Sequence, residues 1–356
     1  MTLFIVVMSI AVLGWLAMRR VLAGIDLSAF DHAVDPGARE VFGEVSGPSP
    51  EHQAEVVRIR DLAGKVKKMS GRGRLDATRQ LLEELSQGRE FGCRFIPVVA
   101  DGVPAEWVLA PGVQPSRRVL YIHGGAFVAG SPRSHRSITT RFSEIADASV
   151  LAVDYRLMPE HRRRDGIEDC RSAYRWLLDN GPDGPEAPTR ILVGGDSAGG
   201  NLALMLAAWV RDQGLPAPGA VVALSPLTDA THSGPSILRN LQTDVMLGPL
   251  FSALVRVPRP LLFLSFLMYN RALPTEPAFS PIFGNLAGLP PILVQVSEAE
   301  MLLDDAVRYV NKARASGTDA RLQCWRGLMH VWQAFYPQVP EAREAFDKIG
   351  EFVNSV

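Results

Sequence analysis

Cysteine is scarce in this 356-residue chain, and neither sign of charge is in excess. The three cysteines, Cys93, Cys170 and Cys324, lie far apart and form neither a metal-spaced pair nor a disulfide framework. Such usage suits a reducing compartment or a fold that is indifferent to redox state. The 37 basic and 38 acidic residues give a formal net charge of −1, so we expect no electrostatic surface for nucleic acid.

Internal repeats and low-complexity runs are missing as well. Hydrophobic residues make up 47% of the sequence and charged residues 21%, which excludes the disordered, collagen-like and coiled-coil classes. A chain of this length buries most of its apolar surface without disulfides. It fits two domains, or one large α/β domain with insertions.

An apolar run opens the chain, and residues 2–18 carry no charge before Arg19 and Arg20. A helix of this length extends about 25 Å, slightly less than the ~30 Å of a hydrocarbon core. The positively charged start of a secretory signal is missing. We predict that residues 1–25 form a single N-terminal membrane anchor, with the catalytic part on the cytoplasmic side because the two arginines stay inside. A cleaved signal peptide and an apolar helix folded onto the protein are the alternatives.

The region before the first strand pattern divides into two parts. Residues 26–50 are mixed and contain several prolines and glycines, which indicates linker and loop. Helical patterns follow over residues 51–70 and 75–86. We expect residues 26–88 to form a linker and N-terminal helices outside the main sheet, and residues 89–356 to form the catalytic domain.

After Glu90, short apolar runs alternate with helical patterns. This alternation predicts an α/β fold with a mostly parallel, eight-stranded sheet and helices on both faces. The runs VLYI, VLAV, ILVG and ILVQV are apolar throughout, as expected for strands buried on both faces. The predicted strands are 94–100, 106–110, 119–122, 150–154, 191–194, 220–224, 292–296 and 320–325, and the predicted helices are 137–146, 167–180, 199–213, 302–316 and 341–353.

One strand end carries the pattern Gly-x-Ser-x-Gly. Residues 191–204 read ILVGGDSAGGNLAL, in which a strand enters the GDSAG turn and a helix follows. This is the arrangement of a nucleophile elbow, where a serine sits on a tight turn that glycines make possible. Ser197 is therefore the candidate nucleophile, although a serine at a helix start is often only an N-cap.

A second strand runs into paired glycines. Residues 120–130 read LYIHGGAFVAG, and paired glycines leave backbone N–H groups unobstructed, as an oxyanion hole requires. We predict that Gly124, Gly125 and Ala198 donate hydrogen bonds to the oxyanion, and that His123 orients the loop. An ordinary glycine turn is the alternative.

The third group of candidates is C-terminal. Residues 292–305 read ILVQVSEAEMLLDD and residues 321–332 read RLQCWRGLMHVW, which gives the chain order serine, acid, histidine of α/β hydrolases. His330 follows the final strand and is the candidate base. His32 and His52 lie in the N-terminal region, and we expect His135, His161 and His232 to be polar loop residues. The residues alone leave the acid open among Glu298, Glu300, Asp304 and Asp305, since carboxylates that open a helix often serve only its dipole.

These residues together resemble the hormone-sensitive-lipase-like carboxylesterases, the bacterial family IV lipolytic enzymes of the α/β-hydrolase superfamily. The likeness covers about residues 106–353. It rests on HGG at 123–125, DYRLMPEH at 154–161, GDSAGG at 195–200 and His330, and residues 280–291 look like the stretch before the family's acid.

The resemblance implies an α/β-hydrolase fold whose helical cap combines the N-terminal helices with an insertion at about 233–271. It also implies Glu300 as the acid, because EMLLD at residues 300–304 matches the family's spacing, with Asp304 the runner-up. The chain departs from the pattern at Ala126, where the family has a third glycine, and at arginines 162–164, where it has proline and aromatics. We expect these arginines to be solvated rather than to face anionic lipid head groups.

The cap insertion contains an uncharged run, PLLFLSFLMYN at residues 260–270. The run is too short to span a bilayer, so we expect a buried cap helix. An interfacial patch or a channel for an acyl chain is the alternative.

The residues and the resemblance together predict a serine carboxylic ester hydrolase. It acts on short to medium acyl esters through a Ser-His-Glu triad and a covalent acyl-enzyme, with Glu300 orienting His330. We expect a small-molecule or lipid ester as substrate, membrane association through residues 2–18, and no metal, cofactor or nucleic acid. An acyltransferase or amidase with the same acyl-enzyme, and a non-catalytic ligand-binding protein on a hydrolase scaffold, are the alternatives. The oligomeric state stays open.

Overall fold

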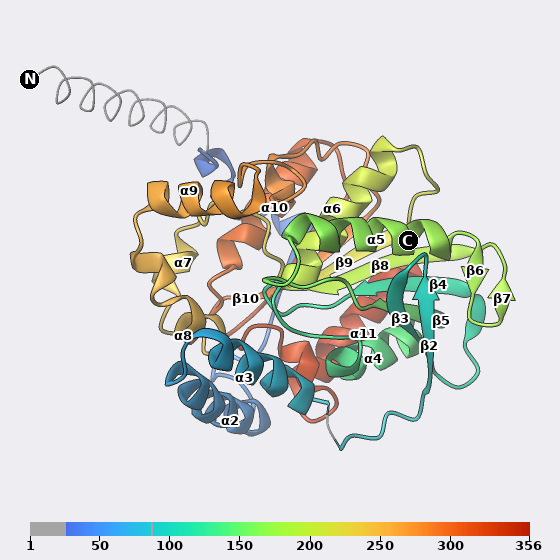
Figure 1. Ribbon diagram of the computed structural model, residues 1–356, viewed down its shortest axis with the longest axis horizontal. Helices are drawn as coiled ribbons and strands as arrows, with labels where there is room; N and C mark the ends of the chain where they lie inside the picture. The colour runs from blue at the N-terminus through green and yellow to red at the C-terminus, as the bar shows by residue number, and fades with distance from the viewer. Residues whose placement is uncertain (1–25, 87) are drawn as a thin grey trace, which may run out of the picture.

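A nine-stranded sheet runs through the described part of the chain, residues 26–86 and 88–356 of a computed structural model (Figure 1). The strand order is β1-β11-β10-β9-β8-β4-β5-β3-β2, and all neighbours pair in parallel except β3 with β5 and β2 with β3. The strands are β1 (Arg39–Phe42), β2 (Arg94–Ala100), β3 (Val103–Leu109), β4 (Gln114–Ile122), β5 (Ala148–Val153), β8 (Arg190–Asp196), β9 (Ala220–Leu224), β10 (Ile292–Ser297) and β11 (Ala320–Trp325), with β6 (Asn180–Gly181) and β7 (Gly184–Pro185) in a separate hairpin.

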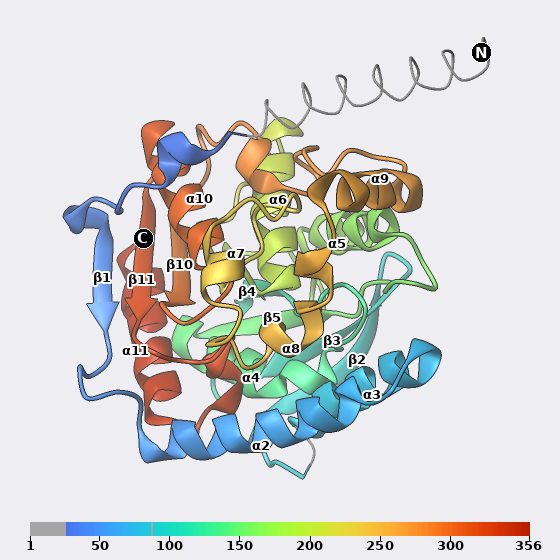
Figure 2. The same cartoon turned by 90° about the vertical axis from the view of Figure 1, so that its left-hand side faces the viewer.

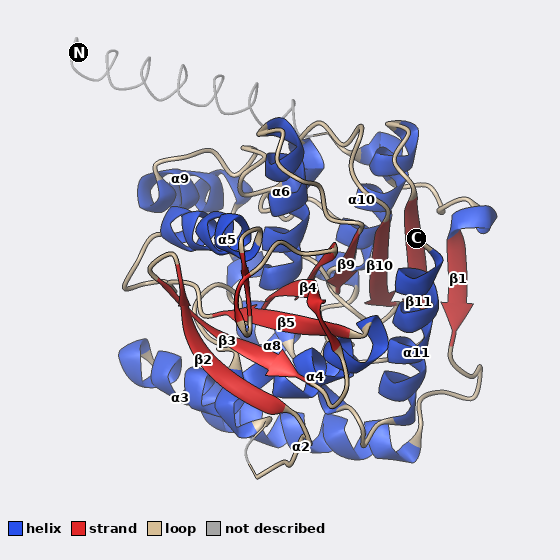
Figure 3. Cartoon of the chain, turned by 90° about the vertical axis from the view of Figure 1, so that its right-hand side faces the viewer, coloured by secondary structure: helices blue, strands red, loops and turns tan. Residues whose placement is uncertain are grey.

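Helices cover both faces of this sheet, as Figure 3 shows. Helices α5, α6 and α10 pack on one face, and α4 and α11 pack on the other. The α-helices are α2 (Pro50–Lys67), α3 (Gly71–Glu84), α4 (Arg136–Ala146), α5 (Arg163–Leu177), α6 (Ala198–Asp212), α7 (Ser236–Arg239), α8 (Leu247–Phe251), α9 (Arg259–Asn270), α10 (Leu303–Ala315) and α11 (Pro340–Ser355). The short 3₁₀ helices are η1 (Ser28–Phe30), η2 (Pro36–Ala38), η3 (Arg133–His135), η4 (Leu254–Arg256), η5 (Pro281–Phe283) and η6 (Trp332–Phe335).

The central strands are apolar throughout because each of their faces meets a helical layer. In β4, Leu120 and Ile122 belong to the core beneath α5 and α6, whereas Val119 and Tyr121 belong to the core beneath α4 and α11. Successive side chains of a strand point to opposite faces, so a continuous apolar run serves both cores. The predicted α/β-hydrolase class of fold is confirmed.

The predicted number of strands is wrong by one. The ninth strand, β1, lies in residues 26–50, which we expected to be linker and loop. It pairs in parallel with β11 at the edge of the sheet, where Phe42 stacks on Trp325 with ring centroids 4.7 Å apart. A four-residue edge strand with two exposed positions shows no apolar run, so the sequence pattern does not reveal it.

Helices from two parts of the chain lie over the carboxyl ends of the strands. Helices α2 and α3 come from residues 26–88, and α7, α8 and α9 come from residues 233–271. Helix α2 contacts α8, and both groups lie on the left of the molecule in Figure 1, the side that faces the viewer in Figure 2. This is the position we expected for a cap, and the boundaries of the two parts as domains stay predictions.

The prediction of a membrane-associated protein is wrong for the part of the chain that the structure describes. Within residues 26–86 and 88–356, no helix is both long and apolar enough to cross a membrane. Residues 2–18, on which the prediction of an anchor rested, lie outside the described residues. The cytoplasmic orientation was inferred from the same segment and is withdrawn with it.

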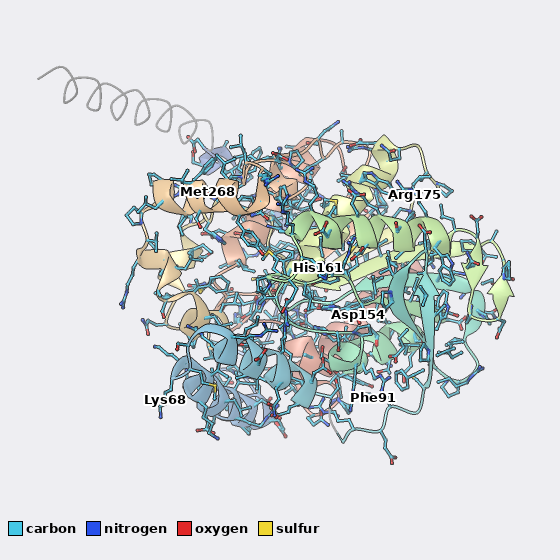
Figure 4. The ribbon with its side chains drawn as sticks, in the orientation of Figure 1. Lys68, Phe91, Asp154, His161, Arg175 and Met268 are labelled. Carbon is cyan, nitrogen blue, oxygen red and sulfur yellow. The ribbon has the colours of Figure 1, made fainter. Side chains whose placement is uncertain are left out.

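Helix α9 contains the uncharged run of the insertion and is only partly buried. Phe263 is buried, whereas Met268, labelled in Figure 4, is 73% exposed. Leu262 and Phe266 line the large cavity described below. The expectation of a buried cap helix therefore holds for one face of α9 and fails for the other.

The core beneath α4 and α11 gives a stability prediction. Phe346 of α11 is fully buried and meets Phe142 of α4 edge-on, with ring centroids 6.1 Å apart. Phe346→Ala should lower the free energy of unfolding by about 3–5 kcal/mol, because it removes buried surface and leaves a cavity. Urea titration followed by tryptophan fluorescence measures this change. Asp347→Ala is the control, since its side chain is 62% exposed, and it should cost less than about 1 kcal/mol. Equal losses in the two variants would contradict the packing described here.

Candidate active site

Ser197 occupies the sharp turn between β8 and α6. Its backbone lies in the left-handed region, with φ 53° and ψ −114°, a conformation that costs a residue with a side chain about 1–3 kcal/mol. Hydrogen bonds hold the turn in place, because Ser197 N donates to Leu224 O at 2.7 Å and Asn201 N donates to Ser197 O at 3.1 Å. A Cβ atom on Gly199 would overlap the carbonyl oxygen of Ile122. The turn therefore requires glycine beside a strained serine.

Three side chains from separate strand ends meet at this turn. His330 Nε2 lies 2.9 Å from Ser197 Oγ, and His330 Nδ1 lies 2.6 Å from Glu300 Oε2. Glu300 follows β10 and His330 follows β11, and the carboxyl ends of parallel strands share one edge of a sheet. Glu300 and His330 are buried, whereas Ser197 is partly exposed and faces the cavity.

The other carboxylates near this strand end do not reach the histidine. Asp304 accepts a hydrogen bond from Ser236 N at 2.5 Å and pairs with Arg239 at 3.2 Å. Asp305 accepts from the backbone of the segment after β9. Of the four candidates, only Glu300 contacts His330.

The second oxygen of Glu300 is also bound by the protein. Oε1 accepts from Ser225 Oγ at 2.9 Å and from Ser297 N at 2.7 Å. Burial raises the pKa of Glu300, and the nearby His330 opposes that rise without cancelling it. Burial lowers the pKa of His330, but the charge of Glu300 and their hydrogen bond outweigh burial, so the pKa of His330 is raised.

The N–H of Gly124, which we predicted to donate to the oxyanion, has another acceptor in the structure. This N–H donates to Asp196 Oδ1 at 3.1 Å, an oxygen that also accepts from the Tyr121 hydroxyl at 2.7 Å. The same carboxylate lies 3.3 Å from His135 Nε2. A buried carboxylate needs these donors, so the N–H of Gly124 is committed to Asp196.

Gly125, Ala126 and Ala198 line the cavity beside Ser197. Among the described residues, no acceptor meets the N–H of these three. Gly125 and Ala126 both have positive φ, 111° and 55°, which turns the chain away from Asp196 after Gly124. We did not predict Ala126 as a donor, because the family has glycine at this position. A backbone N–H can donate whatever the side chain.

Three of the remaining histidines, His52, His123 and His135, are buried beside the site. Burial, together with the neighbouring His135, lowers the pKa of His123 to about 3, and its ring stacks on Tyr155 with centroids 4.4 Å apart. His52 of α2 is buried, and its Nε2 accepts from Met329 N at 3.0 Å, next to His330. His123 thus lies in the predicted loop, whereas the role of His52 was missed because it depends on a tertiary contact.

A cavity of about 820 Å³ opens in front of Ser197. Its walls are mainly apolar and come from α2, α3, α8, α9 and residues 125–128 of the predicted oxyanion loop. Among residues 26–86 and 88–356, no cluster of three His, Cys, Asp or Glu side chains is arranged to hold a metal ion. The cavity has the size and apolar character of sites for small organic molecules.

The insertion fastens the turn that carries Glu300. Asn240 Nδ2 donates to Glu298 O at 2.8 Å and to Glu300 O at 2.7 Å. Asp244 Oδ2 accepts from Met301 N at 2.9 Å, and its other oxygen accepts from Leu247 N at 2.8 Å. These two polar residues were missed, because their role depends on contacts with a turn far along the chain.

Comparison with known proteins agrees with this geometry. Residues 119–334 match the α/β-hydrolase fold family. The chain is 37% identical over 255 residues to an acetyl-hydrolase of Streptomyces hygroscopicus, covering 70% of this chain and 79% of that one. It is 38% identical over 256 residues to the carboxylesterase/phospholipase LipF of Mycobacterium tuberculosis, covering 70% and 66%. A crystal structure of an esterase from the bacterial hormone-sensitive lipase family superposes with a TM-score of 0.74 at 37% identity, covering 86% and 98%.

The sheet, the serine turn and these likenesses define an α/β hydrolase. Within that class, the chain belongs to the hormone-sensitive-lipase-like carboxylesterases. The predicted family and the predicted class of enzyme, a carboxylesterase or lipase-like hydrolase, are confirmed.

The contacts of the insertion give a testable prediction. Asp244→Ala leaves the buried N–H groups of Met301 and Leu247 without acceptors, so the free energy of unfolding should fall by about 1–3 kcal/mol. Ester hydrolysis should fall too, because the Glu300 turn loses a support. Thermal denaturation and an ester assay measure both effects. Thr243→Ala is the control, since its exposed hydroxyl bonds the same turn at Ala299 O. An Asp244→Ala variant as stable and active as Thr243→Ala would contradict the support assigned to Asp244.

Proposed function

We propose that this protein hydrolyses carboxylic esters through a triad of Ser197, His330 and Glu300 and a covalent acyl-enzyme. The observation that carries the proposal is the hydrogen-bonded series from Glu300 Oε2 through both ring nitrogens of His330 to Ser197 Oγ. A nucleophile, a base within hydrogen-bond reach and a carboxylate that orients the base are the parts that acyl transfer through serine requires.

In the first half-reaction, Ser197 Oγ attacks the ester carbonyl while His330 Nε2 takes its proton. The carbonyl oxygen becomes negative, and the N–H groups of Gly125, Ala126 and Ala198 stabilise it. Loss of one such donor typically costs about 3 kcal/mol of transition-state stabilisation. His330 then returns the proton to the leaving alkoxide, the alcohol departs, and the acyl group stays on Ser197.

In the second half-reaction, water replaces the alcohol. His330 takes a proton from a water molecule that attacks the acyl-enzyme, and the same three donors hold the new oxyanion. Collapse of this intermediate returns the proton to Ser197 and releases the carboxylic acid. Glu300 stays ionised throughout and stabilises the imidazolium of His330, which is the interaction that raises the pKa of His330.

The cavity supports short to medium acyl esters as substrates. Its volume of about 820 Å³ and its apolar walls from the cap helices suit an organic chain of moderate length. Ser197 and His330 both line this cavity, so an ester bound in it reaches the nucleophile.

Removal of the nucleophile or of the base tests the proposal. Ser197→Ala and His330→Ala should each lower kcat for p-nitrophenyl butyrate by about 10⁶, because the two groups act as a unit. Circular dichroism and Tm should stay close to those of the wild type. Ser355→Ala, at the far end of α11, is the matched control and should keep full activity. A Ser197→Ala variant that retains more than about 1% of wild-type activity would contradict the proposal.

The acid is tested by a pair of neighbouring substitutions. Glu300→Gln should lower kcat by about 10⁴, since the imidazolium loses its carboxylate. Asp304→Asn should have a small effect, because Asp304 bonds Ser236 and Arg239 instead.

The dependence of kcat/KM on pH tests whether the charge of Glu300 acts on His330. The base must be neutral, so kcat/KM should rise with pH through the pKa of His330, which is raised above 6.5 in the wild type. Without the Glu300 charge this pKa falls, and the acid limb of Glu300→Gln should move to lower pH. A large loss in Asp304→Asn, or an unmoved acid limb in Glu300→Gln, would contradict the assignment.

A further inference from the structure

Arg163, the first residue of α5, is a buried cation in the wall of the active-site cavity. We expected arginines 162–164 to be solvated, and for Arg163 this is wrong, since it is only 5% exposed. Arg162 and Arg164 are exposed. The side chain of Arg163 points inward because the first turn of α5 lies against α6 and the oxyanion loop.

The protein supplies Arg163 with neutral partners only. Its Nη2 donates to Asn201 Oδ1 at 2.8 Å and to Phe279 O at 2.9 Å, and its guanidinium carbon lies 3.8 Å from the centroid of the Phe127 ring. Its Nε is buried without an acceptor. Nη1 forms no hydrogen bond within the described residues and, unlike Nε, is not enclosed by protein atoms.

No carboxylate compensates this charge. Among the described residues, no Asp or Glu oxygen lies within 4.0 Å of the Arg163 nitrogens. Residues 1–25 contain neither Asp nor Glu, and residue 87 is glutamine. Burial lowers the pKa of Arg163 to about 9, so the side chain is still cationic at neutral pH. Buried charges are normally paired, and aromatic rings and neutral acceptors replace a counter-ion only in part.

The position of Arg163 places this charge close to the reacting centre. Asn201, which binds Nη2, lies one helical turn after Ser197, a rise of about 6 Å along α6. Phe127, which the guanidinium covers, directly follows Gly125 and Ala126. Arg163 therefore adjoins both the helix that carries the nucleophile and the loop that holds the oxyanion.

Two further arginines lie in the cavity wall, which is otherwise mainly apolar. These are Arg74 and Arg259, and neither pairs with a carboxylate among the described residues. Burial lowers the pKa of His232; Asp229 opposes this, and the charges of Arg163 and Arg259 lower it further. The one carboxylate of the lining, Asp196, is already bound by Tyr121, Gly124 and His135.

We propose that Arg163 is a specificity residue that binds a carboxylate of the substrate, so that the preferred substrates are esters carrying a free carboxylate on an otherwise apolar chain. The substrate carboxylate supplies the counter-ion that the protein lacks, while the apolar walls hold the chain. A hydrogen bond from a buried guanidinium to a carboxylate is among the stronger polar contacts of proteins. This inference rests on the proposed ester hydrolysis at Ser197.

A purely structural role for Arg163 is the competing explanation. The guanidinium packs between Phe127 and Phe279 and ties α5 to α6, so its removal could disturb the site for every ester. Such a disturbance changes charged and neutral esters alike. The ratio of kcat/KM for a free acid to that for its methyl ester isolates the recognition of charge.

Two matched pairs of esters test the inference with the full-length protein. In the first pair the acyl part carries the charge: mono-p-nitrophenyl glutarate against its methyl ester. In the second the alcohol part carries it: p-butyryloxybenzoate against its methyl ester. In the wild type the free acid should be preferred by about tenfold or more in at least one pair. Arg163→Gln should lower that ratio about tenfold, and Arg163→Lys should retain part of it.

Arg164→Gln is the control, because Arg164 neighbours Arg163 but its side chain is 54% exposed and pairs with Glu276. Its ratio should equal that of the wild type. A wild-type ratio of one or less in both pairs overturns the inference, and so does an unchanged ratio in Arg163→Gln. If Arg163→Gln does not fold, the wild-type ratio and the ratio of Arg163→Lys decide. If the wild type hydrolyses none of the four esters, the proposed function has failed instead.

Discussion

The 2.6 Å hydrogen bond between Glu300 and His330 is the contact on which the arrangement of the site depends. A carboxylate fully buried in protein is unfavourable unless donors surround it, and here the donors come from the hydroxyl of Ser225, the backbone of Ser297 and the imidazole. The ends of β9, β10 and β11 therefore have to converge. The insertion adds Asn240 and Asp244, which fasten the Glu300 turn from outside the sheet. The insertion thus lines the cavity and also holds the Glu300 turn.

A second buried carboxylate, Asp196, organises the opposite side of Ser197. It binds the hydroxyl of Tyr121 and the N–H of Gly124, and it lies beside His135. The N–H of Gly124 is bonded to this carboxylate, whereas the next two residues, Gly125 and Ala126, line the cavity. One buried carboxylate therefore contacts His330, and the other holds the loop that contains Gly125 and Ala126.

Much of the fold and the core of the candidate site were predictable from local patterns. Apolar runs mark strands buried on both faces, and the turn around Ser197 requires glycines at fixed positions, so both leave a trace in the sequence. The structure brings Ser197, Glu300 and His330 together because each directly follows a strand of a parallel sheet. The edge strand Arg39–Phe42 was not predicted, because a partly exposed edge strand needs no apolar run in the sequence.

What the sequence did not reveal depends on contacts between distant elements. The sequence does not distinguish the roles of Gly124 and Gly125, because both are glycines of one loop. In the structure, the carboxylate of Asp196 accepts the N–H of Gly124. Arg163 stands between two exposed arginines, and only the packing of α5 on α6 turns it inward. His52 and Asp244 act through single hydrogen bonds to loops far along the chain.

In the proposed reaction, Ser197 attacks a carbonyl whose oxygen is held by Gly125, Ala126 and Ala198. A crystal structure of the protein after reaction with an alkyl fluorophosphonate tests it most directly, since the tetrahedral adduct resembles the intermediate. We expect phosphorus bonded to Ser197 Oγ and a phosphoryl oxygen about 2.7–3.1 Å from the nitrogens of these three residues. An adduct on another side chain, or a phosphoryl oxygen bound by the N–H of Gly124, would contradict it.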